Sequence, residues 1–215
     1  MPCCCPHSRS AGRFFSRFAR RYRQRFRRKG FEPSQRDLLE GIGRAGFQGA
    51  TLLEIGCGVG TLHQQLLKQG AERAVGVDLA PRMIEEAEAL AREDGLANRA
   101  RYRVGDFVEE AETFEPADVV ILDKVICCYP DAKRIVETSA GRARRVYAYS
   151  IPRNRWYTRF GVALTALAFR LFGSDFRPYV HDPERIEVWL RAAGFARRYE
   201  HRTLAWLTRV CVSER

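Results

Sequence analysis

Residues 51–60 have the sequence TLLEIGCGVG, and this stretch decides the fold. A short apolar run ends at the carboxylate Glu54, and three glycines follow at alternating positions: Gly56, Gly58 and Gly60. Glycine has no Cβ and tolerates positive φ, so such a loop lets the backbone approach a ligand closely. A helix-like stretch over 61–69 follows, and its N-terminal N–H groups and dipole point at whatever the loop holds. The pattern predicts a nucleotide-type cofactor site at the mouth of an α/β sheet.

The glycine spacing excludes two other nucleotide-binding loops. The dinucleotide fingerprint Gly-x-Gly-x-x-Gly needs glycine at position 61, where Thr61 stands. A start at Gly58 fails as well, because His63 occupies the position of the last glycine. The phosphate loop ending in Gly-Lys-Ser/Thr does not occur in the chain.

Three further apolar runs end in residues that suit a ligand. Residues 74–77 precede Asp78 and Leu79, residues 101–104 precede the turn Gly105-Asp106-Phe107, and residues 118–122 precede Asp123 and Lys124. A carboxylate at position 78 can accept both hydroxyls of a ribose. Open α/β sheets bind ligands at the carboxyl ends of their strands, where these residues are expected.

Each acid also has a purely local interpretation. Glu54 can cap the turn that follows it, Asp78 can cap a helix before Pro81, and Asp106 can be an ordinary turn residue. Together, these interpretations require three unrelated carboxylates at successive strand ends on the ligand side of the sheet.

This order of motifs resembles the class I S-adenosylmethionine (SAM) dependent methyltransferases, with Glu54 in the acidic position of the first motif. The resemblance implies SAM as cofactor and S-adenosylhomocysteine (SAH) as product. It implies that Asp106 accepts from the adenine amine, that Phe107 packs nearby, and that the strand end at Asp123 meets the substrate. The cofactor-binding residues it implies are Glu54, Gly56, Cys57, Gly58, Gly60, Asp78, Leu79, Asp106, Phe107 and Asp123.

Strand-like and helix-like stretches alternate from residue 50 to 150, which predicts a parallel sheet with helices on both faces. Residues 195–201 and 205–212 are expected to form a closing antiparallel pair. The fold class is therefore α/β, with a Rossmann-like, seven-stranded, mostly parallel sheet whose last strand is antiparallel. We expect one methyltransferase domain over residues 31–215.

The basic charge is concentrated in an N-terminal arm, residues 1–30. The formal net charge is +11, and the arm holds nine arginines and one lysine without an acidic residue. Its aromatic residues recur every four positions and would form one stripe on a helix: Phe14, Phe18, Tyr22 and Phe26. Such a helix can close the cofactor pocket, lie on an anionic membrane or bind RNA, and the first two roles are compatible.

The seven cysteines are odd in number and form no Cys-x-x-Cys pair, so neither a disulfide framework nor a zinc site is expected. The cluster Cys3-Cys4-Cys5 is expected to lie in a disordered tail, with metal binding or lipid attachment as alternatives. No metal site and no cleavable signal are predicted, which favours the cytoplasm, with peripheral contact at the inner face of the membrane as an extension.

The substrate side of the chain is distinctive. The stretch LDKVICCYPD, residues 122–131, resembles bacterial relatives of magnesium-protoporphyrin O-methyltransferase, which also have a Tyr-Pro after the fourth strand. An apolar insertion over 153–173 is expected to cover the substrate, or else to complete the core or form an oligomer contact. Its apolar run is about half of what a membrane span needs.

The catalytic candidates on this side are Asp123, Tyr129 and His181. A general base is needed only if the accepting atom carries a proton. The predicted function is methyl transfer from SAM to O, N or C of an apolar or aromatic small molecule. Two alternatives remain at this stage: a non-catalytic SAM-binding module tethered to RNA or membrane by the arm, and an NAD-dependent oxidoreductase.

Overall fold

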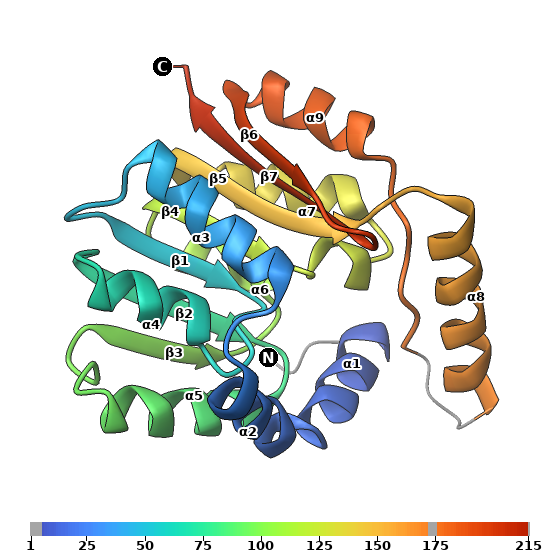
Figure 1. Cartoon of the computed structure of the whole chain (residues 1–215), viewed down its shortest axis with the longest axis horizontal. Coiled ribbons are helices and arrows are strands. Elements are labelled where there is room, and N and C mark those ends of the chain that lie inside the picture. Colours follow the sequence, from blue (N-terminus) through green and yellow to red (C-terminus); the bar gives the residue numbers. More distant parts are fainter. Residues whose placement is uncertain (1–5, 172–175, 215) are drawn as a thin grey trace.

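Seven strands form one sheet in the order β3-β2-β1-β4-β5-β7-β6 (Figure 1). The structure is a computed structural model that describes residues 6–171 and 176–214. The strands are β1 (Thr51–Ile55), β2 (Arg73–Asp78), β3 (Ala100–Val104), β4 (Ala117–Asp123), β5 (Ala143–Pro152), β6 (Phe195–Arg202) and β7 (Trp206–Ser213). The four apolar runs predicted around the glycine loop are thus four neighbouring strands.

The strand directions confirm the predicted fold class. β1 pairs in parallel with β2 and β4, β2 with β3, and β4 with β5. β7 pairs antiparallel with both β5 and β6, so the reversed last strand lies between them. The carboxyl ends of β1, β2 and β4 therefore meet at one edge of the sheet, where the predicted ligand residues follow each strand.

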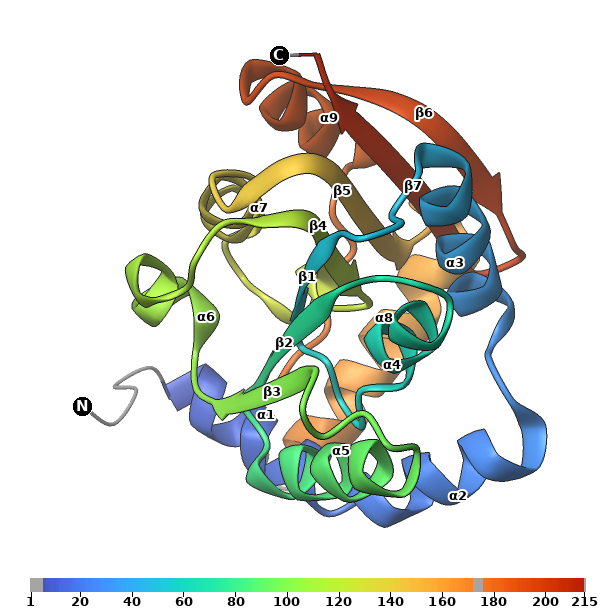
Figure 2. The same cartoon turned by 90° about the vertical axis from the view of Figure 1, so that its left-hand side faces the viewer.

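Helices cover both faces of the sheet (Figure 2). One face carries α3 (Pro33–Ala45), α4 (Thr61–Lys68) and α5 (Pro81–Glu93), whose apolar side chains share one core cluster with alternate strand residues. The other face carries α6 (Phe107–Glu110), α7 (Ala132–Ala140) and α9 (Pro183–Ala192) around a second cluster. Short 3-10 turns at Ala111–Thr113 and Ile126–Cys128 complete this side.

The sequence of β1 shows how one strand serves both cores. Leu52 packs toward the α3–α4 side and Leu53 toward the α6–α7 side, because successive side chains of a strand point to opposite faces. Val119 and Val120 of β4 divide in the same way. Continuous apolar runs are typical of strands buried on both faces.

The N-terminal arm forms two helices rather than one. They are α1 (Pro6–Ser16) and α2 (Ala19–Lys29), and the chain between them turns through bonds from the N–H of Arg17 to the carbonyl of Phe14 and from Phe18 to Phe15. The single aromatic stripe predicted for the arm is therefore wrong. The four-residue spacing of the aromatic residues predicted one continuous helix, but tertiary packing decides the structure here. Ala19, the first residue of α2, is buried against Val59 of the glycine loop and Met83 of α5.

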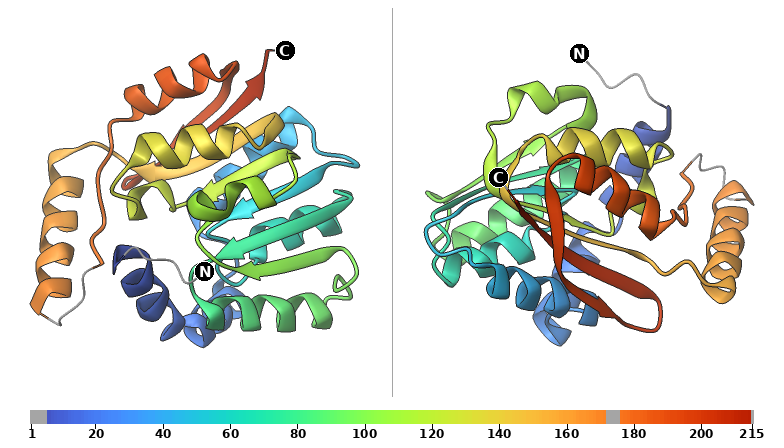
Figure 3. Two further views of the ribbon diagram at one scale, coloured as in Figure 1. Left: turned by 180° about the vertical axis from the view of Figure 1, so that it is seen from behind. Right: turned by 90° about the horizontal axis from the view of Figure 1, so that it is seen from above.

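The insertion after β5 forms α8 (Trp156–Leu171), which stands at the margin of the molecule in Figure 1 and in both views of Figure 3. Residues 172 and 173 of the predicted insertion lie outside the described residues, as do Cys3, Cys4 and Cys5. Within the described ranges, none of the helices has both the length and the apolar character needed to cross a bilayer.

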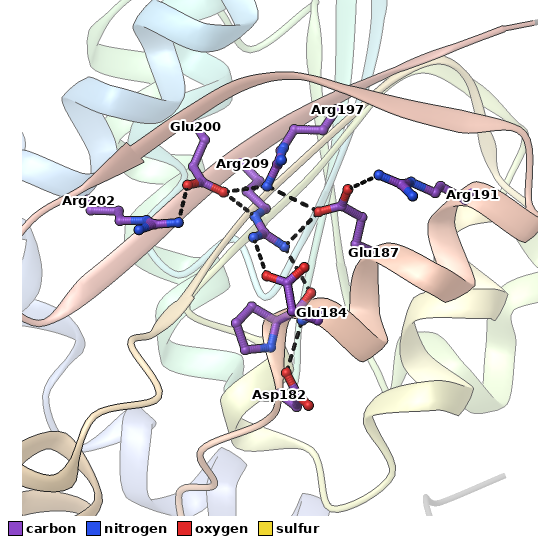
Figure 4. Close-up of polar contacts among 9 residues, drawn as sticks. Asp182, Glu184, Glu187, Arg191, Arg197, Glu200, Arg202 and Arg209 are labelled. Atoms are coloured by element: carbon purple, nitrogen blue, oxygen red, sulfur yellow. Dashed lines mark hydrogen bonds and ion pairs between the residues drawn. The ribbon is translucent and has the colours of Figure 1, made fainter.

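A buried ion network joins the last two strands to α9 (Figure 4). Arg209 of β7 is only 1% exposed, and its guanidinium contacts Glu184 at 2.8 Å, Glu187 at 3.1 Å and Glu200 at 2.7 Å. Arg191 also pairs with Glu187, from the solvent side. A buried charge is tolerated when it is paired and hydrogen-bonded, so this network fixes how α9 sits on the sheet.

Candidate active site

A cavity lies at the carboxyl ends of β1, β2 and β4. It holds about 1140 Å³ of empty space, including the open solvent at its mouth, and is large enough for a cofactor-sized ligand. Of the ten predicted cofactor residues, seven line it: Glu54, Gly56, Cys57, Gly58, Asp78, Leu79 and Asp123. Gly60, Asp106 and Phe107 are not among its lining residues in the described part of the chain.

The backbone of the glycine loop adopts the positive φ angles that its glycines allow. Gly56, Gly58 and Gly60 all have positive φ, at 63°, 54° and 75°. A Cβ on Gly56 would lie 2.4 Å from a methyl carbon of Val125, so that position is closed by packing. A Cβ on Gly58 would meet no protein atom within 4 Å, and Gly58 lines the cavity. The loop therefore leaves an open cradle at Gly58 that a ligand can occupy.

Asp78 is held in place by two backbone donors. Its carboxylate accepts from the N–H of Gly58 and from the N–H of Ala80, each at 2.8 Å. Burial raises the pKa of Asp78 to about 6, against the opposing effect of these two bonds. Asp78 is not the cap of α5, whose N-cap residue is Ala80. A ribose diol would supply the further donors that favour the ionised form of this carboxylate.

Glu54 is the end of a buried hydrogen-bond chain that the sequence did not reveal. Its carboxylate accepts from the backbone N–H of His63 at 3.2 Å and from Nδ1 of His63 at 2.6 Å. Nε2 of His63 lies 2.9 Å from the hydroxyl of Tyr102, which also accepts from the amide of Gln64 at 2.7 Å. Because a carboxylate accepts, Nδ1 of His63 donates to Glu54, and the hydroxyl of Tyr102 is the hydrogen-bond partner of Nε2. Glu54 thus caps α4 and lines the cavity at once.

The Gly-Asp-Phe turn is built as a helix start. Asp106 is buried, and its carboxylate accepts from the N–H of Val108 at 3.1 Å and from the hydroxyl of Tyr129. Phe107 packs against Phe114 in the core. Asp106 is therefore positioned beside the cavity through Tyr129, which lines it. The predicted adenine contact of Asp106 and Phe107 stays a prediction.

The end of β4 joins the sheet to the N-terminal segment. Asp123 accepts from the hydroxyl of Ser150 at 2.5 Å and from the amide of Gln35 at 3.1 Å. Lys124 follows with φ of 60°, a left-handed conformation that is strained for a residue with a Cβ. Its ammonium pairs with Glu32, just before α3, rather than with Asp123. All of these residues except Ser150 line the cavity.

His181 sits away from the cavity lining in the described part of the chain. Its Nε2 lies 2.9 Å from the backbone carbonyl of Tyr129, so this nitrogen donates, and its ring stacks on Tyr179. Burial lowers the pKa of His181, against the opposing effect of its contacts with backbone carbonyls. This contact supports the loop that carries Tyr129, and a direct role in catalysis stays a prediction.

The arm supplies one wall of the cavity. Ala11 and Phe15 of α1 and Tyr22, Arg25 and Phe26 of α2 all line it. A Cβ on Gly12 would lie 2.5 Å from the carbonyl oxygen of Leu79, so this glycine lets α1 approach the end of β2. In the sequence, only the repeated aromatic residues of the arm indicated that the arm would line the cavity.

Known proteins resemble the chain over a region that includes the glycine loop and the strand ends around the cavity. A methyltransferase domain family matches residues 52–146. The ubiquinone biosynthesis O-methyltransferase of Xylella fastidiosa (strain 9a5c) is 30% identical over 160 residues, covering 70% of this chain and 63% of that protein. The ribosomal protein L11 methyltransferase of Deinococcus radiodurans is 35% identical over 95 residues, covering 43% of this chain and 35% of that protein. The chain thus spans less than two thirds of the length of these curated relatives.

A solved structure matches the fold over almost its whole length. The magnesium protoporphyrin IX methyltransferase of Synechocystis PCC 6803, determined with bound SAH, has a TM-score of 0.70 at 21% identity, covering 94% of this chain and 98% of that chain. The match therefore includes regions outside residues 52–146. Neither an NAD-dependent oxidoreductase nor a non-catalytic RNA-tethered module is favoured by these comparisons.

Proposed function

We propose that the chain is a class I SAM-dependent methyltransferase and that it methylates an O, N or C atom of an apolar or aromatic small molecule. One observation carries the proposal: a single cavity joins the glycine loop and Asp78 on one side to Asp123, Tyr129 and the aromatic arm on the other. Cofactor residues and an apolar compartment thus share one space. SAH is the expected product.

The residues around the cofactor half fit SAM. Asp78 would hold the ribose hydroxyls, since its carboxylate is fixed by two backbone donors and faces the cavity. The open cradle at Gly58 would let the backbone contact the cofactor directly. Glu54, held by His63, would present its carboxylate on the same wall. When bound, SAM supplies a methyl group that is electrophilic because its sulfur is a sulfonium.

The aromatic part of the cavity lining supports the proposed apolar or aromatic acceptor, and Arg25, Glu32 and Lys124 line the same cavity. Phe15, Tyr22 and Phe26 of the arm line the cavity, together with Val125 and Tyr129. These side chains would position the acceptor and exclude water, and positioning alone can supply several kcal/mol of rate acceleration. The ubiquinone enzyme, named for a small-molecule pathway, resembles a larger share of this chain than the ribosomal protein enzyme does.

Among the predicted catalytic residues, Asp123 is best placed to accept a proton, because its carboxylate lines the cavity at the end of β4. Ser150 and Gln35 donate to it and fix its orientation. Tyr129 would orient the acceptor while its hydroxyl donates to Asp106. An acceptor whose reacting atom carries no proton, such as a carboxylate, would use Asp123 only for positioning.

The cellular setting forms part of the proposal. We place the enzyme in the cytoplasm, with peripheral contact between the N-terminal arm and the inner face of the membrane. Arg20, Arg23 and Arg27 of α2 all pair with carboxylates of α5, and the Arg20 side chain is still 85% exposed. The outward arginines would face anionic lipid while the aromatic side of the arm closes the cavity.

The test is methyl transfer from labelled SAM. Purified protein would be incubated with methyl-labelled SAM and an extract of cells that lack the gene, and the organic, acid-precipitable and aqueous fractions would be counted. Label in the organic phase supports the proposal, and Asp78→Asn should lose most of it. Label in the acid precipitate would identify a protein or nucleic acid acceptor and contradict it.

A further inference from the structure

The outward side of α8 carries an unpartnered apolar surface, formed by Trp156, Phe160, Leu164 and Leu167 and called here the α8 apolar face. Their exposed fractions are 78%, 68%, 58% and 53%. Positions 156, 160, 164 and 167 fall within an arc of about 80°, since each residue turns a helix by about 100°. The stripe extends over about 16 Å of helix. Half of the large apolar side chains that are exposed among the described residues lie on this face.

The contacts that hold α8 to the protein use its other sides. Near its C-terminal end, Phe169 packs edge-to-face on Phe14 of α1 at 4.7 Å. Near its start, the hydroxyl of Tyr157 donates to the carbonyl of Leu204, in the turn between β6 and β7, at 2.8 Å. Leu204 is itself 79% exposed and lies next to that end of the helix. The α8 apolar face is therefore not needed to dock the helix.

The charged residues of α8 and of the segment around it, 153–173, are all basic. Residues 153–173 contain four arginines and no aspartate or glutamate. Arg155, Arg159 and Arg170 are exposed and fall on one side of the apolar stripe. The neighbouring arm adds the exposed Arg13 of α1 and the exposed Arg17, which follows α1. A helix of 16 residues with this pattern suits the surface of an anionic bilayer rather than its interior.

We propose that the α8 apolar face enters the headgroup region of an anionic lipid bilayer, with the surrounding arginines on the phosphates. Long arginine side chains can lie along apolar surface while their charged ends reach the polar layer. A second copy of the chain fits the face less well. Pairing two copies there would bring together two chains of net charge +11 with their basic arms adjacent.

With the α8 apolar face on the bilayer, the cavity would lie close to the membrane surface. α1 contacts α8 through Phe14 and lines the cavity through Phe15, so α8 itself and α1 lie between the docked face and the site. A helix is about 10 Å across. The inference extends the peripheral contact proposed for the arm, but it does not depend on methyl transfer. The described residues of the predicted cover, 153–171, do not line the cavity, and their role as a cover stays a prediction.

The test is co-sedimentation of the full chain with vesicles of phosphatidylcholine alone or mixed equally with phosphatidylglycerol. The test variant is the triple change Phe160→Gln, Leu164→Gln, Leu167→Gln, which retains Trp156 as a fluorescence probe. Glutamine is a good helix former, so α8 should persist. We expect wild type to bind the anionic vesicles with a blue shift of tryptophan emission, and the triple variant to bind them roughly tenfold or more weakly.

Val188→Gln is the matched control, because Val188 is 63% exposed on α9, away from α8. It should bind vesicles as wild type does. Equal binding by the triple variant and wild type would overturn the inference, and so would a wild-type dimer in lipid-free solution that the triple variant abolishes. SAH binding measured on the same proteins separates the two proposals: wild type that binds vesicles but not SAH would refute the proposed function alone.

Discussion

The raised pKa of Asp78 predicts that cofactor affinity depends on pH. Burial raises this pKa to about 6, and nearby Glu54 acts in the same direction. A ribose diol donates two hydrogen bonds to the carboxylate, so the cofactor binds the ionised form. Affinity should then follow the ionised fraction of Asp78 in the free protein, and it should fall as the pH drops below about 6.

The size of the effect follows from that pKa. With a pKa of about 6, Asp78 is about 90% ionised at pH 7 and about 9% ionised at pH 5. The dissociation constant should therefore rise about tenfold between these pH values, which corresponds to about 1.4 kcal/mol. The α-amino and α-carboxyl groups of SAH titrate at roughly 8 and 3.5 in model compounds, outside this range.

The assay is isothermal titration of the protein with SAH at pH 7, 6 and 5. Asp78→Asn is the control, because it keeps the shape of the side chain and removes its charge. We expect this variant to bind SAH about 1–3 kcal/mol more weakly at pH 7, with almost no further loss at pH 5. A tenfold loss that persists in Asp78→Asn would assign the proton to another group, such as Glu54 or His63, and refute the reasoning.

Two further predictions concern stability and use matched pairs of variants in urea unfolding. Gly56→Ala should destabilise the protein by about 1–3 kcal/mol more than Gly58→Ala, because only the Cβ at position 56 overlaps Val125, while both positions have positive φ. Gly58→Ala should instead mainly weaken SAH binding, and equal stabilities would show that the loop tolerates the overlap. Arg209→Met should cost about 1.5–3 kcal/mol, because it removes a buried guanidinium and its charge-assisted hydrogen bonds to Glu200 and Glu184. Arg191→Met should cost at most about 1 kcal/mol, because the Arg191 side chain is 68% exposed and Glu187 keeps its ion pairs with Arg197 and Arg209. Similar losses for the two arginine variants would contradict this account of the network.

Sequence alone predicted those site residues that directly follow a strand within a short stretch of chain. The glycine loop, Asp78 and Asp123 each directly follow an apolar run, and parallel strands bring their carboxyl ends to one edge. The reversed β7 was predictable as well, because two alternating runs separated by a short turn signal an antiparallel pair.

The rest depends on contacts between distant residues. His63 was not predicted to hold Glu54, because a single histidine on a helix gives no sign of what it faces. The ion network of Arg209 joins α9, β6 and β7, and many other pairings of the same charges are compatible with the sequence. The break between α1 and α2 lies where Ala19 packs on the glycine loop, and no glycine or proline marks it.

The central claim is that one cavity holds the cofactor at Asp78 and the acceptor beside Asp123. A crystal structure of the protein with SAH tests it most directly. We expect both ribose hydroxyls within hydrogen-bond distance of the Asp78 carboxylate, with the SAH sulfur facing the part of the cavity that Asp123 and Tyr129 line. SAH bound elsewhere, or with its ribose turned away from Asp78, would contradict it.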